Sequence, residues 1–469
     1  MIGYMENAES RNFDVELFVT TARKAPVTVR VQAQDTNNAS LDVTFTVTAG
    51  GVKQLFIDNS YRNIKTGMSQ KGILVTSSDE IVIYGVNKER NSNDAFLGLP
   101  TDVIGTEYYA TTYAPATRYC LILVVGVHDN TTVEITFPDQ ADVNITYDGQ
   151  WYGPNSKLTL KMHRFSTFQA HNVGDLTGTY VKSDKPVSFF SGNKKTKIGP
   201  GNSQDHLVEQ QVPVSRWGRK FAIMPVPDRV VGDYFRFVAS EENTTVTVRG
   251  QNQGQSFEES FTLASPGDWI QKNYSSTSFS YVESSKAILL VQYVLSMVSD
   301  NADPAMFIIP PIEQYAADYT FTTPKWTGGN QGRSDPNVTE YSYFNYFMFV
   351  VKDSEKYGLR MDGRRLPSNT EYNIIPGTDL VAGYVSLTDG THICRHISPI
   401  SVFGGYLYGR QRLESYAFPS GMRLAPINAP CTKTTTGPGD GLDNDCDGLI
   451  DEELCYDDGQ GIGMVQYYS

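Results

Sequence analysis

The stretch LVVGVHDNTTVEITF, at residues 123–137, decides the fold class. Its apolar run leads into a polar turn, and alternating apolar and polar residues follow, which is typical of a β-hairpin with one buried face. The same layout recurs in FRFVASEENTTVTVRG at residues 235–250, and fainter copies begin at Glu16 and Phe347. The chain is therefore predicted to be an all-β protein with four internal repeats.

Two further signatures follow the hairpins in a fixed order. The first signature consists of a strand, a polar turn and a second strand. It aligns Ser77, Ser183 and Ser284, and His396 stands at the same place in the fourth copy. We interpret these serines as turn residues, because a repeat copies structure whereas an active site is usually singular. The second signature places a small residue five positions after a proline and an aromatic residue three beyond it; its members are Pro100, Gly105, Tyr108; Pro213, Gly218, Phe221; and Pro311, Ala316, Tyr319.

Four copies share residues 13–426, so each holds about 100 residues, twice the length of a usual propeller blade. The favoured architecture is a β-propeller of the eight-bladed type, built from paired four-stranded blades. The alternative is four tandem β-sandwich modules. Residues 1–12 are assigned as an N-terminal tail, residues 427–439 as a linker and residues 440–469 as an acidic segment that contains cysteines.

Composition narrows the functional class. The formal net charge of −13 disfavours attraction to nucleic acid, and no run of 18 apolar residues predicts a membrane span. The first residues show no secretion signal. Sequons for N-glycosylation nevertheless suggest an extracellular chain; they begin at Asn38, Asn130, Asn144, Asn243, Asn273 and Asn337.

The strings TGTYVKSDKPVSFFSGN, DHLVEQQVPVSRWGRKF and GDYFRFVASEENTTVTV resemble the IgG Fc-binding protein N-terminal domain family. The resemblance covers about residues 13–426 and is strongest in the second and third repeats. It implies an extracellular, non-enzymatic binding or scaffolding role in secreted, mucus-associated proteins. It implies no catalytic residues, and it does not establish immunoglobulin binding for this chain.

The sequence DGLDNDCDGLIDEELC, at residues 440–455, is the strongest metal motif. Several acidic side chains around a glycine turn can converge on a hard cation, so we predict Ca²⁺ binding by Asp443, Asp445, Asp447, Asp451 and Glu452. The loop is not an EF-hand, because Leu454 stands where that pattern needs glutamate. It resembles a short DGxDNDCDGxxDE metal-binding motif of secreted proteins.

The five cysteines fall into two groups. Cys431, Cys446 and Cys455 crowd the tail, where Cys446 can pair with either of the other two, and the sequence leaves both pairings open. Cys120 and Cys394 lie on predicted strands, and buried free thiols are expected there. A leftover thiol would allow a homo-oligomer or filament to form.

Other candidate sites are weaker. The run NKKTKIGPGN offers Lys194, Lys195 and Lys197 in a predicted loop as an anionic-ligand site. Asp205, His206 and Glu209 in DHLVEQ, and the pair His392 and His396, could act as ligands or acids, but satisfied structural side chains are the stronger interpretation. No nucleophile elbow or phosphate loop occurs.

We therefore expect an extracellular binding, adhesion or scaffold domain that recognises glycoproteins or matrix and mucus components, without enzymatic activity. One alternative is a structural component of a secreted matrix or fibre. The other is a glycan-cleaving propeller, which would need two carboxylates converging on a central channel.

Overall fold

The computed structural model describes residues 1–8, 14–34, 41–89, 92–116, 118–296, 303–324, 343–411, 414–429 and 434. These residues form antiparallel sheets joined by turns and a few short 3₁₀ helices, so the all-β prediction is confirmed. In the described residues, no helix is long and apolar enough to cross a membrane. The metal, cysteine and linker predictions for residues 430–433 and 435–469 lie outside the described residues, as do Asn38 and Asn337.

The first module has two sheets. One has the strand order β4 (Val52–Ile57), β1 (Val15–Thr20), β7 (Val82–Val86) and β8 (Ala95–Leu97), and the other has the order β3 (Asp42–Val47), β2 (Val27–Ala33) and β6 (Ile73–Ser77). The module also contributes η1 (Asn59–Tyr61) and the short β5 (Gly67–Ser69), which pairs with the second module.

The second module repeats this plan. Its first sheet has the order β18 (Asp205–Gln210), β17 (Val187–Thr196), β10 (Cys120–Gly126) and β15 (Thr167–Asn172), followed by β5. Its second sheet has the order β14 (Lys157–Met162), β11 (Thr131–Thr136), β16 (Tyr180–Ser183) and β9 (Glu107–Tyr109), and β12 (Ile145–Tyr147) and β13 (Gln150–Tyr152) form a hairpin.

The third module merges its sheets into one, because β24 (Phe279–Val294) runs through both. The N-terminal half of β24 pairs with β21 (Thr244–Asn252) and β19 (Gly218–Ile223), and its C-terminal half pairs with β20 (Asp233–Ala239) and β25 (Ala305–Ile308). The outer edges are β22 (Gln255–Leu263) and β23 (Trp269–Tyr274), and η2 (Val214–Arg216) precedes the module.

The fourth module returns to two sheets. One has the order β30 (Asn373–Ile374), β31 (Leu380–Leu387), β27 (Phe344–Lys352), β33 (Gly404–Gln411) and β34 (Glu414–Pro419). The other has the order β26 (Asp318–Thr322), β32 (Thr391–His396), β28 (Leu359–Met361) and β29 (Arg364–Arg365), with η3 (Ile312–Gln314) and η4 (Lys356–Gly358) nearby.

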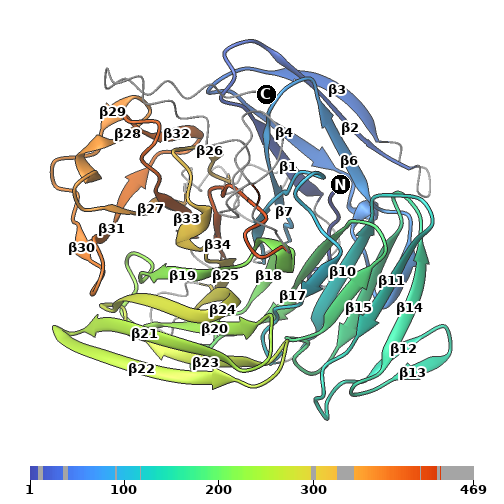
Figure 1. Ribbon diagram of the computed structural model, residues 1–469. Coiled ribbons are helices and arrows are strands. Elements are labelled where there is room, and N and C mark those ends of the chain that lie inside the picture. The colour runs from blue at the N-terminus through green and yellow to red at the C-terminus, as the bar shows by residue number, and fades with distance from the viewer. Residues whose placement is uncertain are drawn as a thin grey trace.

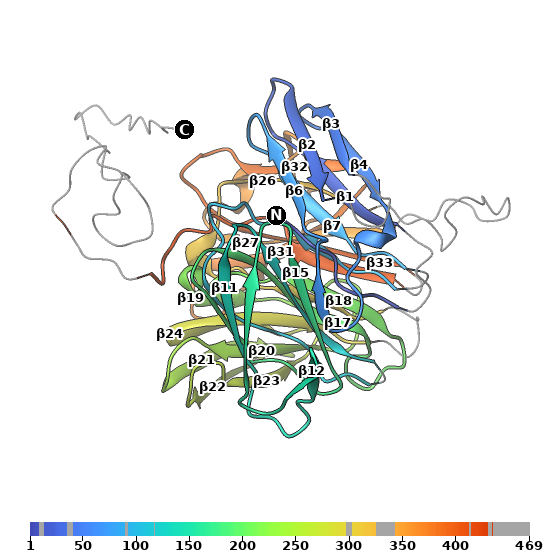
Figure 2. The ribbon, with the colours of Figure 1, turned by 90° about the vertical axis from the view of Figure 1, so that its right-hand side faces the viewer.

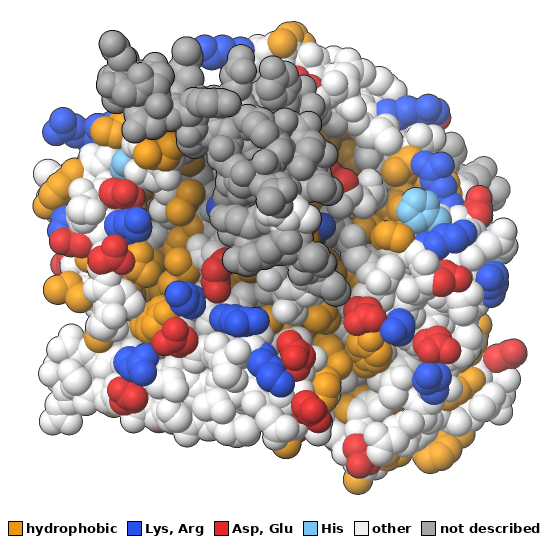
Figure 3. Space-filling view, viewed as in Figure 1, with side chains coloured by type: hydrophobic (Ala, Val, Ile, Leu, Met, Phe, Trp, Pro, Cys, Tyr) orange, Lys and Arg blue, Asp and Glu red, His pale blue; other side chains and the backbone are white. Residues whose placement is uncertain are grey.

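The modules follow one another around a common centre (Figure 1), and on the same face acidic and basic side chains are interspersed (Figure 3). The last strand of each module lies there: β18 contacts β8 and β25, and β34 contacts β25 and β8. Figure 2 shows the first module at the top and the third at the bottom. The core is apolar and continuous within the modules, as in β10, where all seven residues are buried.

The serine signature closes the same turn in each copy, which confirms its structural role. The Oγ atoms of Ser77, Ser183 and Ser284 each donate to the carbonyl oxygen two residues later, at 2.6, 2.7 and 2.7 Å. In the fourth copy a nitrogen takes the place of the hydroxyl, and Nδ1 of His396 lies 3.2 Å from the carbonyl oxygen of Ser398.

The proline signature joins neighbouring modules. A Cβ atom on Gly105 would lie 2.7 Å from Cβ of Pro213, and one on Gly218 would lie 2.4 Å from Cβ of Pro311. The small residue of one copy therefore admits the proline of the next. Within the second module, the hydroxyl of Tyr108 accepts from the Gly105 amide at 2.7 Å and donates to the Val187 carbonyl at 2.8 Å, which fixes the glycine of the signature in place.

Residues 1–7, which the sequence analysis separated from the repeats, are buried between the first two modules. Ile2 forms a β-bridge with Ile73, and the carbonyl of Met1 accepts from Oγ of Ser188 at 2.7 Å. Glu6 pairs with Lys194 and His171, each at 2.8 Å. This segment is therefore part of the packed domain.

Candidate functional site

Four carboxylates gather at the centre, one from each module. Asp94 precedes β8, Asp205 begins β18, Asp303 precedes β25 and Glu414 begins β34, and each is at most 1% exposed. Such an arrangement resembles what a glycan-cleaving centre would need, so the hydrogen bonds of these groups decide their role.

The central carboxylates bind the backbone of neighbouring modules. Asp205 accepts from the amides of Asn93 at 2.6 Å and Ser415 at 3.3 Å, and Asp94 accepts from the Val208 amide at 3.0 Å. Burial raises the pKa of Asp94 and Asp205 well above the ordinary value. Asp94 and Asp205 are therefore buried, hydrogen-bonded links between modules, whereas Oδ1 of Asp303 has no hydrogen-bond partner among the described residues.

The histidine and acid candidates are satisfied structural residues, as the sequence analysis favoured. In the edge strand β18, His206 is fully buried, lies 2.9 Å from the side-chain nitrogen of Asn87, and has a pKa lowered by burial to about 3. Glu209 accepts from the Ile308 amide at 3.4 Å. His392 contacts Asp362 and His396 contacts the Glu355 carbonyl, at 2.8 and 2.9 Å.

The lysine candidates are not presented together. Lys194 and Lys195 lie in β17, and only Lys197 follows the strand, so the expected loop is wrong for the first two. Lys194 is 7% exposed and pairs with Glu6, whereas Lys195 and Lys197 are half-buried. The strand continues because β17 pairs with β18 as far as Thr196.

The four sequons within the described residues are accessible to solvent. Asn130, Asn144, Asn243 and Asn273 are all exposed. Asn130 and Asn243 occupy equivalent turns with φ of 55° and 52°, a conformation that asparagine tolerates better than most residues. Glycosylation stays a prediction. Cys120 and Cys394 are buried free thiols, as expected.

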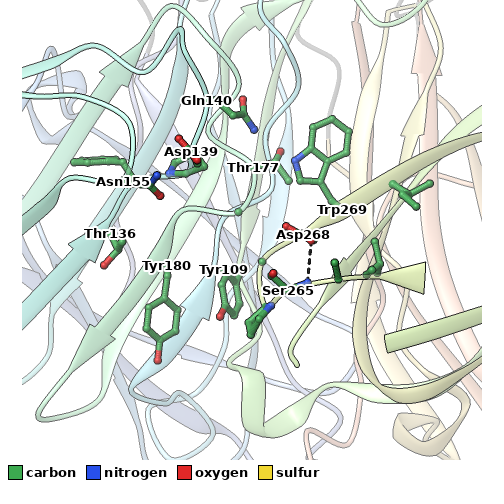
Figure 4. Close-up of a pocket in the computed structure, with 18 of the residues that line it drawn as sticks. Tyr109, Thr136, Asp139, Gln140, Asn155, Thr177, Tyr180, Ser265, Asp268 and Trp269 are labelled. Atoms are coloured by element: carbon green, nitrogen blue, oxygen red, sulfur yellow. Dashed lines mark hydrogen bonds between the residues drawn. The ribbon is translucent and has the colours of Figure 1, made fainter. Parts of the chain in front are cut away.

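A groove of about 780 Å³ lies between the second and third modules (Figure 4). The second module contributes Asp139, Gln140 and Asn155 on one side, and the third contributes Asp268 and Trp269 on the other. Tyr109 and Tyr180 form an aromatic wall, with ring centroids 4.9 Å apart. Among the described residues, the side chains that line the groove include no lysine, arginine or histidine.

A buried arginine beneath Trp269 joins the third module to the second. The guanidinium of Arg236 stacks on the indole at 3.8 Å from its centroid. It donates to Asp175 of the second module at 2.9 Å and to the carbonyl of Thr112 at 2.6 Å. Because Arg236 is 2% exposed, these bonds are shielded from water, and they fix Trp269 against the second module.

Two glycine turns meet at the groove. Gly178 and Gly267 have φ of 89° and 83°, and a Cβ atom on Gly178 would lie 2.7 Å from the carbonyl oxygen of Gly267. Asp268 accepts from the Ser265 amide at 2.8 Å, which fixes the third-module turn. The two sides are therefore set close together by backbone, while the exposed Asp139 and Asn155 line the rim.

The residues that line the groove could not be selected from the sequence. Tyr109, Tyr180 and Trp269 stand at strand ends in two different repeats, and no short motif joins them. Only the repeated β-hairpin pattern indicates that such strand ends meet at module boundaries.

Taken together, the structure defines a multi-module all-β chain with a polar groove walled by aromatic side chains. The family described as IgGFc binding protein matches residues 94–409, and this chain belongs to that family. This match covers a shorter range than residues 13–426, which were expected from the sequence. The chain is also similar to the IgGFc-binding protein of Homo sapiens, with 21% identity over 439 residues. That alignment covers 92% of this chain and 7% of the human protein, so the chain spans a small part of its relative.

Proposed function

We propose that this chain is an extracellular, non-enzymatic binding module that holds a glycoprotein through uncharged sugar residues in the groove between the second and third modules. The observation that carries the proposal is the lining of the groove. Aromatic faces stand beside amide and carboxylate groups, which suits a ligand with both C–H faces and hydroxyl donors. The absence of cationic groups from the lining and the presence of Asp139 and Asp268 disfavour acidic sugars.

Family membership supports a binding role. The human relative is named for binding IgG Fc, and an Fc glycoprotein is therefore one partner to test beside matrix and mucus glycoproteins. The contacts among β8, β18, β25 and β34 support a closed, propeller-like ring of four modules, which would keep the groove rigid.

The proposal is tested by binding of immobilised Fc and mucus glycoproteins, before and after enzymatic removal of their glycans. The double variant Asp139→Ala/Asn155→Gly removes two rim groups, and glycine suits the φ of 57° at Asn155. We expect at least tenfold weaker binding, equivalent to about 1.4 kcal/mol. The control Glu242→Ala removes an exposed acid in a turn outside the groove.

Loss of binding on glycan removal and in the double variant, but not in the control, supports the groove as the site. Equal binding by the wild type, the double variant and the control contradicts the groove as the site. Equal binding to the stripped glycoprotein contradicts sugar recognition and favours a protein epitope.

We also propose that the acidic segment at residues 440–469 binds Ca²⁺ through Asp443, Asp445, Asp447, Asp451 and Glu452. Isothermal titration with Ca²⁺, compared between the wild type and Asp445→Asn/Asp447→Asn, measures this directly. Binding that is unchanged in the variant contradicts the assignment.

A further inference from the structure

Three arginines stand in one row across neighbouring strands of the fourth module. Arg365 of β29 pairs in register with Arg360 of β28, which pairs in turn with Arg395 of β32. Arg395 is exposed between the buried Cys394 and His396, so the row lies on the outer face of the sheet. With strands about 4.8 Å apart, the row spans about 10 Å.

Such a row is unfavourable for the protein alone. Like charges placed directly opposite each other destabilise a sheet, and here two such pairs share Arg360, while Asp318 of β26 stands opposite Arg395 on its other side and offsets part of this cost. No ion pair among the described residues includes any of the three arginines. Asp362, which lies beside them in sequence, is bound to His392 and to the Ile393 amide instead.

The row borders a second cleft. A cavity of about 600 Å³ is lined by Arg360 and Arg395 together with Asp362, Ile393 and Ile397, and by Ala49 and Gly50 from the turn between β3 and β4. The cleft therefore lies between the fourth and first modules, away from the groove at the second and third. Nη1 of Arg360 donates to the carbonyls of Tyr357 and Leu359 at 2.9 and 2.8 Å, which holds this guanidinium in place.

We infer that the arginine row binds a linear sulfated glycan laid across the strands. Guanidinium groups bind oxyanions through paired N–H donors, and a polymer with repeated anionic groups can contact several members of the row at once. The exposed Ile397 beside the row offers an apolar contact to the sugar faces. The net charge of −13 opposes every polyanion at long range, so the attraction has to come from the arginine row itself. This inference stands on a different site and ligand class from the proposed groove.

The test uses the full chain and a heparin-derived octasaccharide, with a hyaluronan octasaccharide as a carboxylate-only comparison. The variant Arg365→Gln/Arg395→Gln removes the two flanking charges and keeps Arg360 with its carbonyl bonds. The matched control Arg30→Gln/Arg249→Gln removes the exposed Arg30 and the half-buried Arg249 from sheets of other modules, where Arg30 pairs with Asp42 and Arg249 pairs with Glu258 and Glu283.

We expect the wild type and the control to bind the sulfated octasaccharide, with affinity that falls as salt rises, and the row variant to bind at least tenfold more weakly. The row variant should melt close to the wild type, because relief of like-charge repulsion is opposed by loss of the cation opposite Asp318. Equal binding by the row variant, no binding by the wild type, or equal affinity for hyaluronan would each overturn the assignment.

Discussion

Arg236 and Asp175 form the buried ion pair that joins the second and third modules beneath the groove, and Asp175→Ala tests its contribution. The side chains are 2% and 8% exposed. Removing one partner leaves an uncompensated buried charge, which costs about 3–5 kcal/mol. Asp175 also accepts from the Thr177 amide at 2.9 Å, and losing that bond adds about 1 kcal/mol. We therefore expect Asp175→Ala to lower the free energy of unfolding by about 4–6 kcal/mol.

The double variant Asp175→Leu/Arg236→Met separates the charge effect from packing. Replacing a buried pair by apolar residues of similar size is often close to neutral, so the double variant should lose clearly less than the sum of the single variants Asp175→Leu and Arg236→Met. Urea denaturation with tryptophan fluorescence measures all of them, with the slopes compared to check that the transition stays cooperative. Two results would contradict the stabilising role of the ion pair. One is a loss below about 1 kcal/mol in Asp175→Ala, and the other is a double variant whose loss equals the sum of the losses in the two single variants.

Three further predictions concern the repeat signatures and the buried acids. Gly218→Ala places Cβ 2.4 Å from Cβ of Pro311, and overpacking of this kind should cost about 1–3 kcal/mol in thermal unfolding; an unchanged melting temperature contradicts the inter-module packing. Ser183→Ala and Ser284→Ala each remove one turn hydrogen bond and should each cost about 1 kcal/mol in urea denaturation, and a neutral result for both would contradict the turn role. Burial raises the pKa of Asp233 to about 6, so its proton stabilises the folded state below about pH 4, and this stabilisation is lost as the pH rises to about 6. Asp233→Asn should flatten this part of the stability profile, and a parallel profile would show that another group is responsible.

The repeats could be predicted because their signals are local. A serine that closes its own turn, or a proline that starts a 3₁₀ turn, uses neighbours within a few residues, as Ser284 with Lys286 and Pro311 with Gln314 show. The sequence could not show that Gly218 of one copy receives Pro311 of the next, because this contact depends on how modules meet.

The sites could not be predicted for the same physical reason. Lys194 looks like part of a solvated basic run, yet its partner Glu6 comes from the buried N-terminal segment 188 residues away. Trp269 gains its role from Arg236 and Asp175, which lie in two modules. The row of Arg360, Arg365 and Arg395 likewise depends on strand register.

The most direct test of glycan binding in the groove is hydroxyl-radical footprinting of the chain with and without a saturating glycoprotein ligand. If the groove binds the glycan, oxidation of Trp269 and Tyr180 falls in the complex, while Trp151 and Tyr357, which are 62% and 73% exposed away from the groove, are oxidised as before. Binding that leaves Trp269 and Tyr180 unprotected would contradict glycan binding in the groove and place the ligand on another surface.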